Sequence, residues 1–358
     1  MQPQVRESAT GWEVSFHEED GMPPYLTFKA DFVERTAWGL LTTLSVASPL
    51  AHQTPLPDGT IMVTRTNLMS ARDRRDVAMR LSQKLEAPKS RRQQDWEAHM
   101  EVLAGAINYE SSKPIPHMDL QEMPLPERQR FLIPGLLARD KTNVIFGPGG
   151  TGKSVLATRI AASVVSGVDL FDLDVLETGP VLYLDWEDDS GTMVQRLEQV
   201  CDGMGIKRVP FKYKRLAGRG SYERHHADVK FYLEKNPTAL VIFDSVAMAM
   251  SGSSGGDGAE GAIRFFGLLD QLPTTRLLID HVASDDVKED DKKGPPKKPY
   301  GSVFKTNSAR NMWAVTPWNE QYMSGITLTH TKTNVSRRHD TMDISVEWRD
   351  SRVTFQRV

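Results

Sequence analysis

The chain has 358 residues, of which 39% are hydrophobic and 25% are charged, as is typical of a soluble globular protein with a sizeable core. Its formal net charge of −3 excludes a strong overall attraction to nucleic acid, so any such binding would need local basic patches. The single cysteine, Cys201, excludes an internal disulfide, and no apolar run is long enough to cross a bilayer, so we expect a cytoplasmic protein without a membrane partner.

Residues 1–110 are predicted to form a small α+β domain. Two helical patterns, one from the N-cap candidate Ser70 to Leu85 and one over residues 94–107, end this domain. The first pattern is locally basic, which suits either nucleic acid or an acidic protein surface. The β-like runs that precede the helices, separated by Gly, Pro and Asp, lie at 12–16, 25–28, 40–46 and 61–64.

A stretch rich in proline follows at residues 111–138. Proline cannot donate to a central β-ladder and breaks helices, so this stretch predicts a semi-rigid linker. Its prolines include Pro114, Pro116, Pro124, Pro126 and Pro134. Residues 139–358 would then form a second domain.

Strand and helix signals alternate from Thr142 onward. This alternation predicts an α/β fold in which a mostly parallel sheet is covered by helices on both faces. Short β runs near the C-terminus predict an antiparallel extension of that sheet. The candidate parallel strands are 142–146, 180–185, 211–216, 239–244 and 276–279, and the later runs are 312–315, 326–331, 342–347 and 353–356.

The run over residues 147–154 matches the phosphate-binding motif G-x-x-x-x-G-K-[ST], between a predicted strand and a predicted helix. Backbone N–H groups of such a loop surround the β- and γ-phosphates. Lys153 would reach these phosphates as a point charge, and the Ser154 hydroxyl would ligate Mg²⁺. We therefore predict ATP and Mg²⁺ as cofactors. The predicted nucleotide-binding residues of this P-loop are Gly147, Pro148, Gly149, Gly150, Thr151, Gly152, Lys153 and Ser154.

Asp244 ends the apolar run at residues 239–243. A buried strand there would deliver the carboxylate to the carboxyl edge of the sheet, where ligands bind in open α/β sheets. We predict that Asp244 holds Mg²⁺ through water, beside Ser154. The alternative is a simple cap of the following helix.

Three carboxylates lie in the run Asp-Trp-Glu-Asp at residues 185–188, where the second strand ends. Glu187, just beyond the strand, would polarise the attacking water as a general base. Asp185 is its main rival for this role. Asp188 and Asp189 are expected to cap the next helix.

The order of these motifs resembles the RecA-type ATPase core, and within it the RepA-like hexameric helicase ATPases of plasmids and phages. The resemblance covers about residues 131–358. It implies a RecA-like P-loop NTPase core at 139–358 that hydrolyses ATP. It also favours Glu187, the glutamate after the second strand, as the catalytic residue.

The same resemblance implies roles for residues further along the chain. The strand 277–281 resembles the one whose last residue senses the γ-phosphate, a role that would fall to His281. By itself, a histidine at the end of a buried strand would more often only bond to the backbone.

Two cations are implied to act on the site of a neighbouring subunit. Residues 300–313 resemble the segment that places an arginine at a subunit boundary, here Arg310. Lys332 resembles a second such position, and Arg337 and Arg338, which follow it, are alternatives to both Arg310 and Lys332. An arginine in this place stabilises charge on the transferred phosphoryl group. These roles imply a homo-oligomer, most simply a hexameric ring.

Two segments are candidates for contact with a nucleic-acid strand threaded through such a ring. Residues 288–298 are rich in lysine, and residues 251–261 are rich in glycine and serine. Charge runs are also common as solvated linkers. The leading hypothesis is a motor on single-stranded nucleic acid, most simply DNA, of the replicative helicase type. The alternatives are a filament-forming recombinase and a regulatory or adaptor ATPase.

Overall fold

The computed structural model contains two compact units, Met1–Pro124 and Leu125–Val358. The middle of the predicted linker, the centre of 251–261 and most of the lysine-rich segment 288–298 lie outside the residues that it describes. The described residues are 3–8, 11–19, 21–51, 59–85, 95–114, 119, 121, 130–252, 258–282, 296, 298–320, 323–349 and 351–358.

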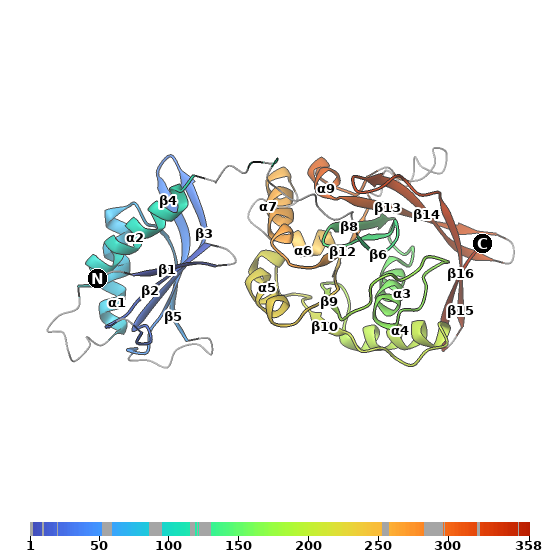
Figure 1. The fold of residues 1–358 in the computed structure, drawn as a ribbon, viewed down its shortest axis with the longest axis horizontal. Helices are drawn as coiled ribbons and strands as arrows, with labels where there is room; N and C mark the ends of the chain where they lie inside the picture. Colours follow the sequence, from blue (N-terminus) through green and yellow to red (C-terminus); the bar gives the residue numbers. More distant parts are fainter. Residues whose placement is uncertain are drawn as a thin grey trace. The chain divides into compact units, whose positions relative to one another are not determined.

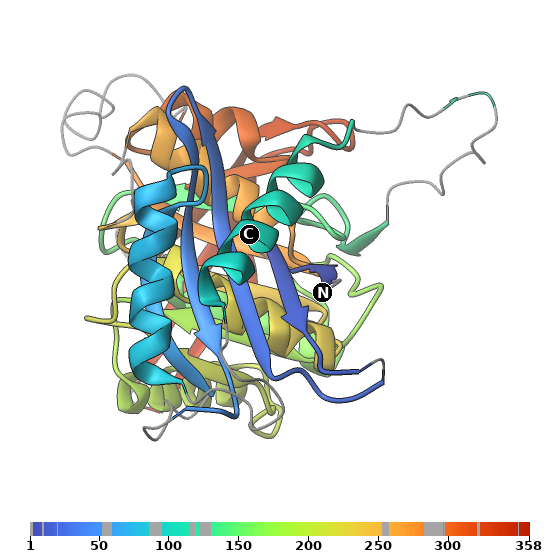
Figure 2. The ribbon, with the colours of Figure 1, turned by 90° about the vertical axis from the view of Figure 1, so that its left-hand side faces the viewer.

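In the first unit, the described residues form a five-stranded antiparallel sheet in the order β1-β2-β3-β4-β5. Alternating apolar residues of the strands pack against α1 and α2, which cover one face of the sheet (Figures 1 and 2). The buried ring of His99 shares a hydrogen bond of 2.8 Å with the hydroxyl of Tyr25. Because Tyr25 directly precedes β3, this bond links α2 to the sheet. The elements are β1 (Gln4–Glu7), β2 (Gly11–Phe16), β3 (Leu26–Thr36), β4 (Gly39–Ala47), β5 (Thr60–Asn67), α1 (Ala71–Lys84) and α2 (Trp96–Ser112).

In the second unit, nine strands of the described chain form one sheet in the order β10-β9-β11-β12-β8-β13-β14-β15-β16. Neighbours from β10 to β13 run parallel, and β13 to β16 run antiparallel to one another. The strands are β8 (Thr142–Gly147), β9 (Val181–Asp185), β10 (Lys212–Arg215), β11 (Leu240–Asp244), β12 (Thr275–His281), β13 (Asn311–Asn319), β14 (Ser324–Thr333), β15 (Met342–Arg349) and β16 (Arg352–Arg357).

Helices cover both faces of the parallel part of this sheet (Figure 1). On one face, Leu156 and Ile160 of α3 pack against Ile242 of β11. On the other, Phe243 of β11 contacts Phe265 of α7 edge to face. The apolar residues of β11 therefore alternate between two cores, as expected for a strand buried on both sides. The helices are α3 (Lys153–Ser166), α4 (Ser190–Gly203), the 3₁₀ turn η1 (Tyr222–Arg224), α5 (His226–Lys235), α6 (Val246–Met250), α7 (Ala259–Asp270) and α9 (Val303–Ser308).

This architecture confirms the predicted fold class: a mostly parallel α/β sheet, an antiparallel C-terminal extension and an α+β N-terminal part. The linker predicted over 111–138 differs at both ends. Helix α2 continues to Ser112, and β6 (Phe131–Ile133) pairs with β7 (Leu137–Ala138) as a hairpin. Leu132 and Leu137 of the hairpin are buried in the same core as α3, while Pro134 lies in the turn, where it removes no ladder hydrogen bond.

A glycine-to-alanine substitution tests the packing of β16 on α4, and a second one at an open position is its control. A Cβ at Gly203, the last residue of α4, would lie 1.8 Å from the Val353 carbonyl oxygen of β16. Gly203→Ala should therefore lower the free energy of unfolding by about 2 kcal/mol, the usual cost of overpacking. Gly267→Ala, at an open position within α7, should raise it by about 0.5–1 kcal/mol. Urea unfolding measures both, and equal midpoints for Gly203→Ala and wild type would contradict the packing described.

Candidate active site

The order of the parallel strands brings four predicted site segments to one edge of the sheet. Asp244 at the end of β11 is in register with Asp185 of β9 on one side and with Ile279 of β12 on the other. His281, which ends β12, is in register with Gly147, which ends β8 and begins the P-loop. Because all these strands run the same way, their carboxyl ends meet at this edge.

The P-loop follows β8 and leads directly into α3. Gly150 and Gly152 have φ angles of 74° and 77°, a left-handed conformation that favours glycine. The Thr151 hydroxyl donates a 3.0 Å hydrogen bond to the Pro148 carbonyl and closes the turn. Lys153, 4% exposed, donates from Nζ to the Gly147 carbonyl at 3.0 Å. Burial lowers the pKa of Lys153, and the nearby carboxylates of Asp244 and Glu187 oppose that effect.

Asp244 is 2% exposed, and its two carboxylate oxygens differ in their surroundings. Oδ2 accepts a 2.7 Å hydrogen bond from the Tyr183 hydroxyl, whereas Oδ1 is buried without a hydrogen-bond partner among the described residues. Burial raises the pKa of Asp244 to about 6, although the hydroxyls of Tyr183 and Ser154 lower it. An unsatisfied carboxylate oxygen beside a serine hydroxyl fits Mg²⁺, which takes oxygen ligands and relieves this kind of charge.

Asp185 and Glu187, the two rivals for the general base, have different surroundings. Asp185 Oδ1 accepts the backbone N–H groups of Glu187 and Asp188 at 2.8 and 3.0 Å, and Oδ2 accepts from the Tyr213 hydroxyl at 3.2 Å. Asp185 is thus occupied in holding the turn that carries Glu187. These contacts favour Glu187 over Asp185 as the residue open to a substrate.

Glu187 follows β9, and its carboxylate contacts residues at the ends of β11 and β12. Its Oε1 accepts a hydrogen bond from the Ser245 hydroxyl and lies 3.3 Å from Nε2 of His281. The hydrogen bond with His281 is the main reason that the pKa of Glu187 is lowered, and Ser245 adds to it. The carboxylate is therefore ionised at neutral pH, the state that a general base requires.

The acids that follow Glu187 divide between two roles. Asp189 caps α4, as predicted, by accepting the backbone N–H groups of Gly191 and Thr192. Asp188 forms an ion pair with Arg196 instead of capping the helix.

Asp280 and Lys305 form a buried ion pair that the sequence analysis did not identify. Lys305 Nζ of α9 lies 3.1 Å from Asp280 Oδ2, and both side chains are below 5% exposure. Asp280 precedes His281, and its Oδ1 accepts the His281 backbone N–H at 2.9 Å. The available signal was the charged residue Asp280 directly after the apolar run 277–279, because buried charges need a partner. Tyr183 and Ser245 were missed too, since hydroxyls have no spacing pattern.

Arg310 does not reach the P-loop of its own chain. Its backbone N–H bonds to the carbonyl of Thr142, the first residue of β8, whereas the P-loop follows the last. Five steps along a strand separate these ends by about 16 Å. The Arg310 side chain is exposed and makes no hydrogen bond or ion pair with any residue in the described ranges.

The other predicted trans-acting cations lie at the same far edge, because Thr333 at the end of β14 pairs with Asn311. Lys332 Nζ donates to the carbonyls of Thr306, Asn307 and Ala309 at 2.5, 3.0 and 2.7 Å. These bonds close the C-terminal end of α9, so Lys332 already serves its own chain. The exposed Arg337 and Arg338 follow β14.

Because the pKa of Asp244 is raised, Asp244→Asn should stabilise the fold by an amount that depends on pH. A pKa raised from 3.8 to about 6 stabilises the fold below pH 3.8, and that contribution is lost as pH rises through 6. Above that pH the ionised carboxylate costs about 3 kcal/mol. Without Mg²⁺ and nucleotide, the unfolding midpoint of Asp244→Asn should therefore rise relative to wild type as the pH increases from about 4 to about 8. Parallel pH profiles of the two proteins would show that Asp244 titrates normally.

One comparison with known protein families bears on this geometry. Residues 111–286 match the model of a family described as an AAA domain. The match includes the P-loop, Glu187, Asp244 and His281, and it ends before α9 and the antiparallel strands. Among the described residues, no helix is long and apolar enough to span a membrane. By the family match, residues 111–286 carry the nucleotide-binding part of a RecA-like P-loop ATPase domain of the AAA type.

Proposed function

We propose that the protein is an ATP-driven motor that moves along single-stranded nucleic acid and completes each active site with residues of a neighbouring subunit. The observation that carries this proposal is the separation of Arg310 from the chain's own P-loop. Lys153, Asp244, Glu187 and His281 gather at one edge of the sheet. Arg310 is exposed at the other edge, where only a second molecule can present a phosphate to it.

Within one subunit, each gathered residue has a part in hydrolysis. Lys153 exchanges its loop carbonyl partners for phosphate oxygens. Ser154 and Asp244 would hold Mg²⁺, which would neutralise charge on the β- and γ-phosphates. Glu187, kept ionised and oriented by Ser245 and His281, accepts a proton from the attacking water.

His281 is suited to link the γ-phosphate to Glu187. Its ring already contacts the Glu187 carboxylate, and its backbone is held on both sides. The His281 N–H bonds to Asp280, and its carbonyl accepts the Tyr300 N–H at 2.7 Å. A histidine fixed in this way responds to a phosphate beside it by changing its bond to Glu187.

The nucleic-acid part of the proposal depends on where the lysine-rich segment is attached. This segment, residues 288–298, lies in the sequence between His281 and Tyr300, whose backbones bond at the site edge. Both ends of the intervening chain are therefore anchored beside Glu187. A segment that contacts phosphates of a strand would be connected directly to the site of hydrolysis.

Mixing two inactive variants tests the shared site. Glu187→Gln should lower turnover by about 10²-fold or more, and Arg310→Ala by about 10³-fold, with ATP binding retained in both. In mixed oligomers an Arg310→Ala subunit retains Glu187 and receives Arg310 from a Glu187→Gln neighbour. After subunit exchange, an equimolar mixture should recover about a quarter of wild-type turnover, because each variant supplies one half of a site.

Arg337→Ala combined with Arg338→Ala is the matched control for Arg310, since these arginines lie at the same edge. This double variant should keep wild-type turnover. No recovery in the mixture would place both residues in the same subunit's site or make Arg310 structural. Loss of turnover in the double variant, with normal turnover in Arg310→Ala, would assign the trans cation to the segment after β14.

Stimulation by nucleic acid tests the motor. Single-stranded DNA should raise ATP turnover at low salt, and the stimulation should fall as salt rises, because phosphate contacts release counterions. Replacing Lys292, Lys293, Lys297 and Lys298 by glutamine should reduce stimulation without changing basal turnover. Absence of stimulation at low salt would instead support a regulatory or adaptor ATPase. Electron microscopy with ATP and DNA distinguishes closed rings from recombinase-like filaments.

A further inference from the structure

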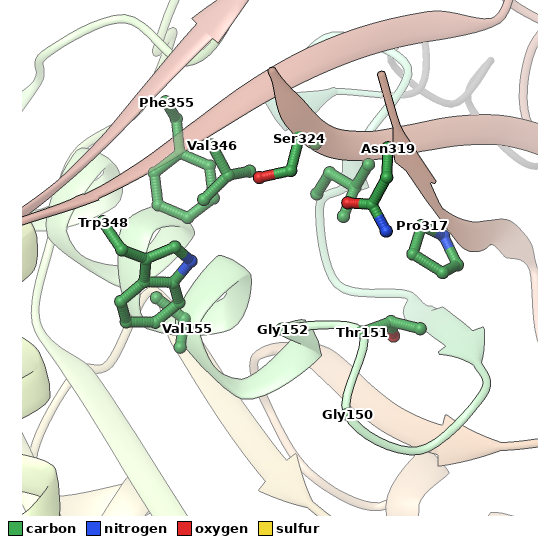
Figure 3. A pocket seen from close by; sticks show the side chains of 12 residues that line it. Gly150, Thr151, Gly152, Val155, Pro317, Asn319, Ser324, Val346, Trp348 and Phe355 are labelled. Carbon is green, nitrogen blue, oxygen red and sulfur yellow. The ribbon is translucent and has the colours of Figure 1, made fainter. Parts of the chain in front are cut away.

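A cavity of about 250 Å³ lies beside the P-loop, between α3 and the antiparallel strands β13–β16 (Figure 3). Trp348 and Phe355 flank it on one side, and Pro317 and Asn319 flank it on the other. Gly150, Thr151 and Gly152 of the P-loop lie along its floor, together with Val155 from the first turn of α3.

The cavity and the P-loop share the three residues from Gly150 to Gly152. A triphosphate held by this loop is attached to a nucleoside, which must leave the loop on a side that has room for it. The side toward Lys153 and Glu187 is the hydrolysis site. The cavity over Gly152 and Val155 offers the room, and no described segment has to move to open it.

The walls of the cavity have the chemistry of a nucleobase site. Trp348 is 55% exposed and presents an indole ring toward the cavity, with Val346 and Phe355 beside it. Aromatic side chains of this kind stack on bases. The Asn319 amide combines a donor and an acceptor, the pair that matches the N6 and N7 edge of adenine. The part of the lining that the structure describes contains no carboxylate.

We propose that this cavity is the base subsite of the ATP bound to the same subunit, with Trp348 stacking on the adenine and Asn319 reading its edge. The proposal rests on nucleotide binding at the P-loop, which is part of the proposed function. Four residues of the cavity wall lie beyond residue 286, outside the segment that matches the AAA domain: Pro317, Asn319, Trp348 and Phe355. The antiparallel extension thus acquires a role in choosing the nucleotide.

Gly325 explains how β14 can form the back of this cavity. A Cβ at Gly325 would lie 2.1 Å from the Ile344 carbonyl oxygen and 2.5 Å from the ring of Trp318. The absence of a side chain lets β14, β15 and the Trp318 ring approach closely. Ile326 and Val346 then lie at the cavity wall.

Calorimetric titration with ATP, GTP and inorganic tripolyphosphate, each with Mg²⁺, tests the subsite. Trp348→Ala should weaken ATP binding by about 5- to 100-fold, the range expected for one lost stacking contact, and leave tripolyphosphate binding unchanged. Trp348→Phe should restore most of the ATP affinity. Asn319→Ala should reduce the preference for ATP over GTP. Trp38→Ala, a control at a tryptophan 89% exposed in the first unit, should bind ATP like wild type.

The outcomes separate the subsite from the nucleotide site itself. Unchanged ATP affinity in Trp348→Ala, or equal affinity of wild type for ATP and tripolyphosphate, would overturn the base subsite while the P-loop function stands. Failure of wild type to bind any of the three ligands would overturn the nucleotide site and the subsite together. Loss of tripolyphosphate binding in Trp348→Ala would show a structural effect and also overturn the assignment.

Discussion

The burial of Asp244 at the carboxyl edge of the parallel sheet is the constraint on which the rest of the site depends. A carboxylate in this position is costly, as its pKa of about 6 indicates, and its neighbours offset the cost only in part. Tyr183 satisfies one oxygen, and Lys153 supplies a nearby positive charge. The remaining oxygen has no hydrogen-bond partner among the described residues, and a magnesium ion bound beside it would restore the balance. In the proposed function, binding of Mg²⁺ and nucleotide would therefore stabilise the fold.

A second set of contacts connects this edge to the opposite one within the same subunit. The buried Asp280–Lys305 pair joins the end of β12 to α9, and Lys332 closes the last turn of α9. Arg310 follows that helix almost immediately. The position of the exposed arginine is therefore fixed relative to His281 by buried polar contacts rather than by a free loop. In an oligomer, this connection would relate the phosphate bound in one subunit to the cation offered to the next.

The parts of the site that could be predicted from sequence are those that are local in the chain. The P-loop is contiguous, and Asp244 ends an apolar run, so the fold class and the alignment of the strand ends followed from pattern. From the residues alone Asp185 stayed a rival of Glu187, because their difference lies in hydrogen bonds from Tyr213 of β10 and from Ser245, which follows β11. The hairpin at 131–138 was hidden by the proline content of its surroundings. Trp348 carried no signal, because only tertiary packing places it over the P-loop.

In the proposed function, one subunit does not contain a complete catalytic site. The decisive measurement is ATP turnover per subunit over a dilution series, together with sedimentation of the same samples. A shared site predicts that turnover per subunit falls on dilution in step with the dissociation of the oligomer. A protein that sediments as a monomer and still hydrolyses ATP at the full rate would show that one subunit contains the complete site.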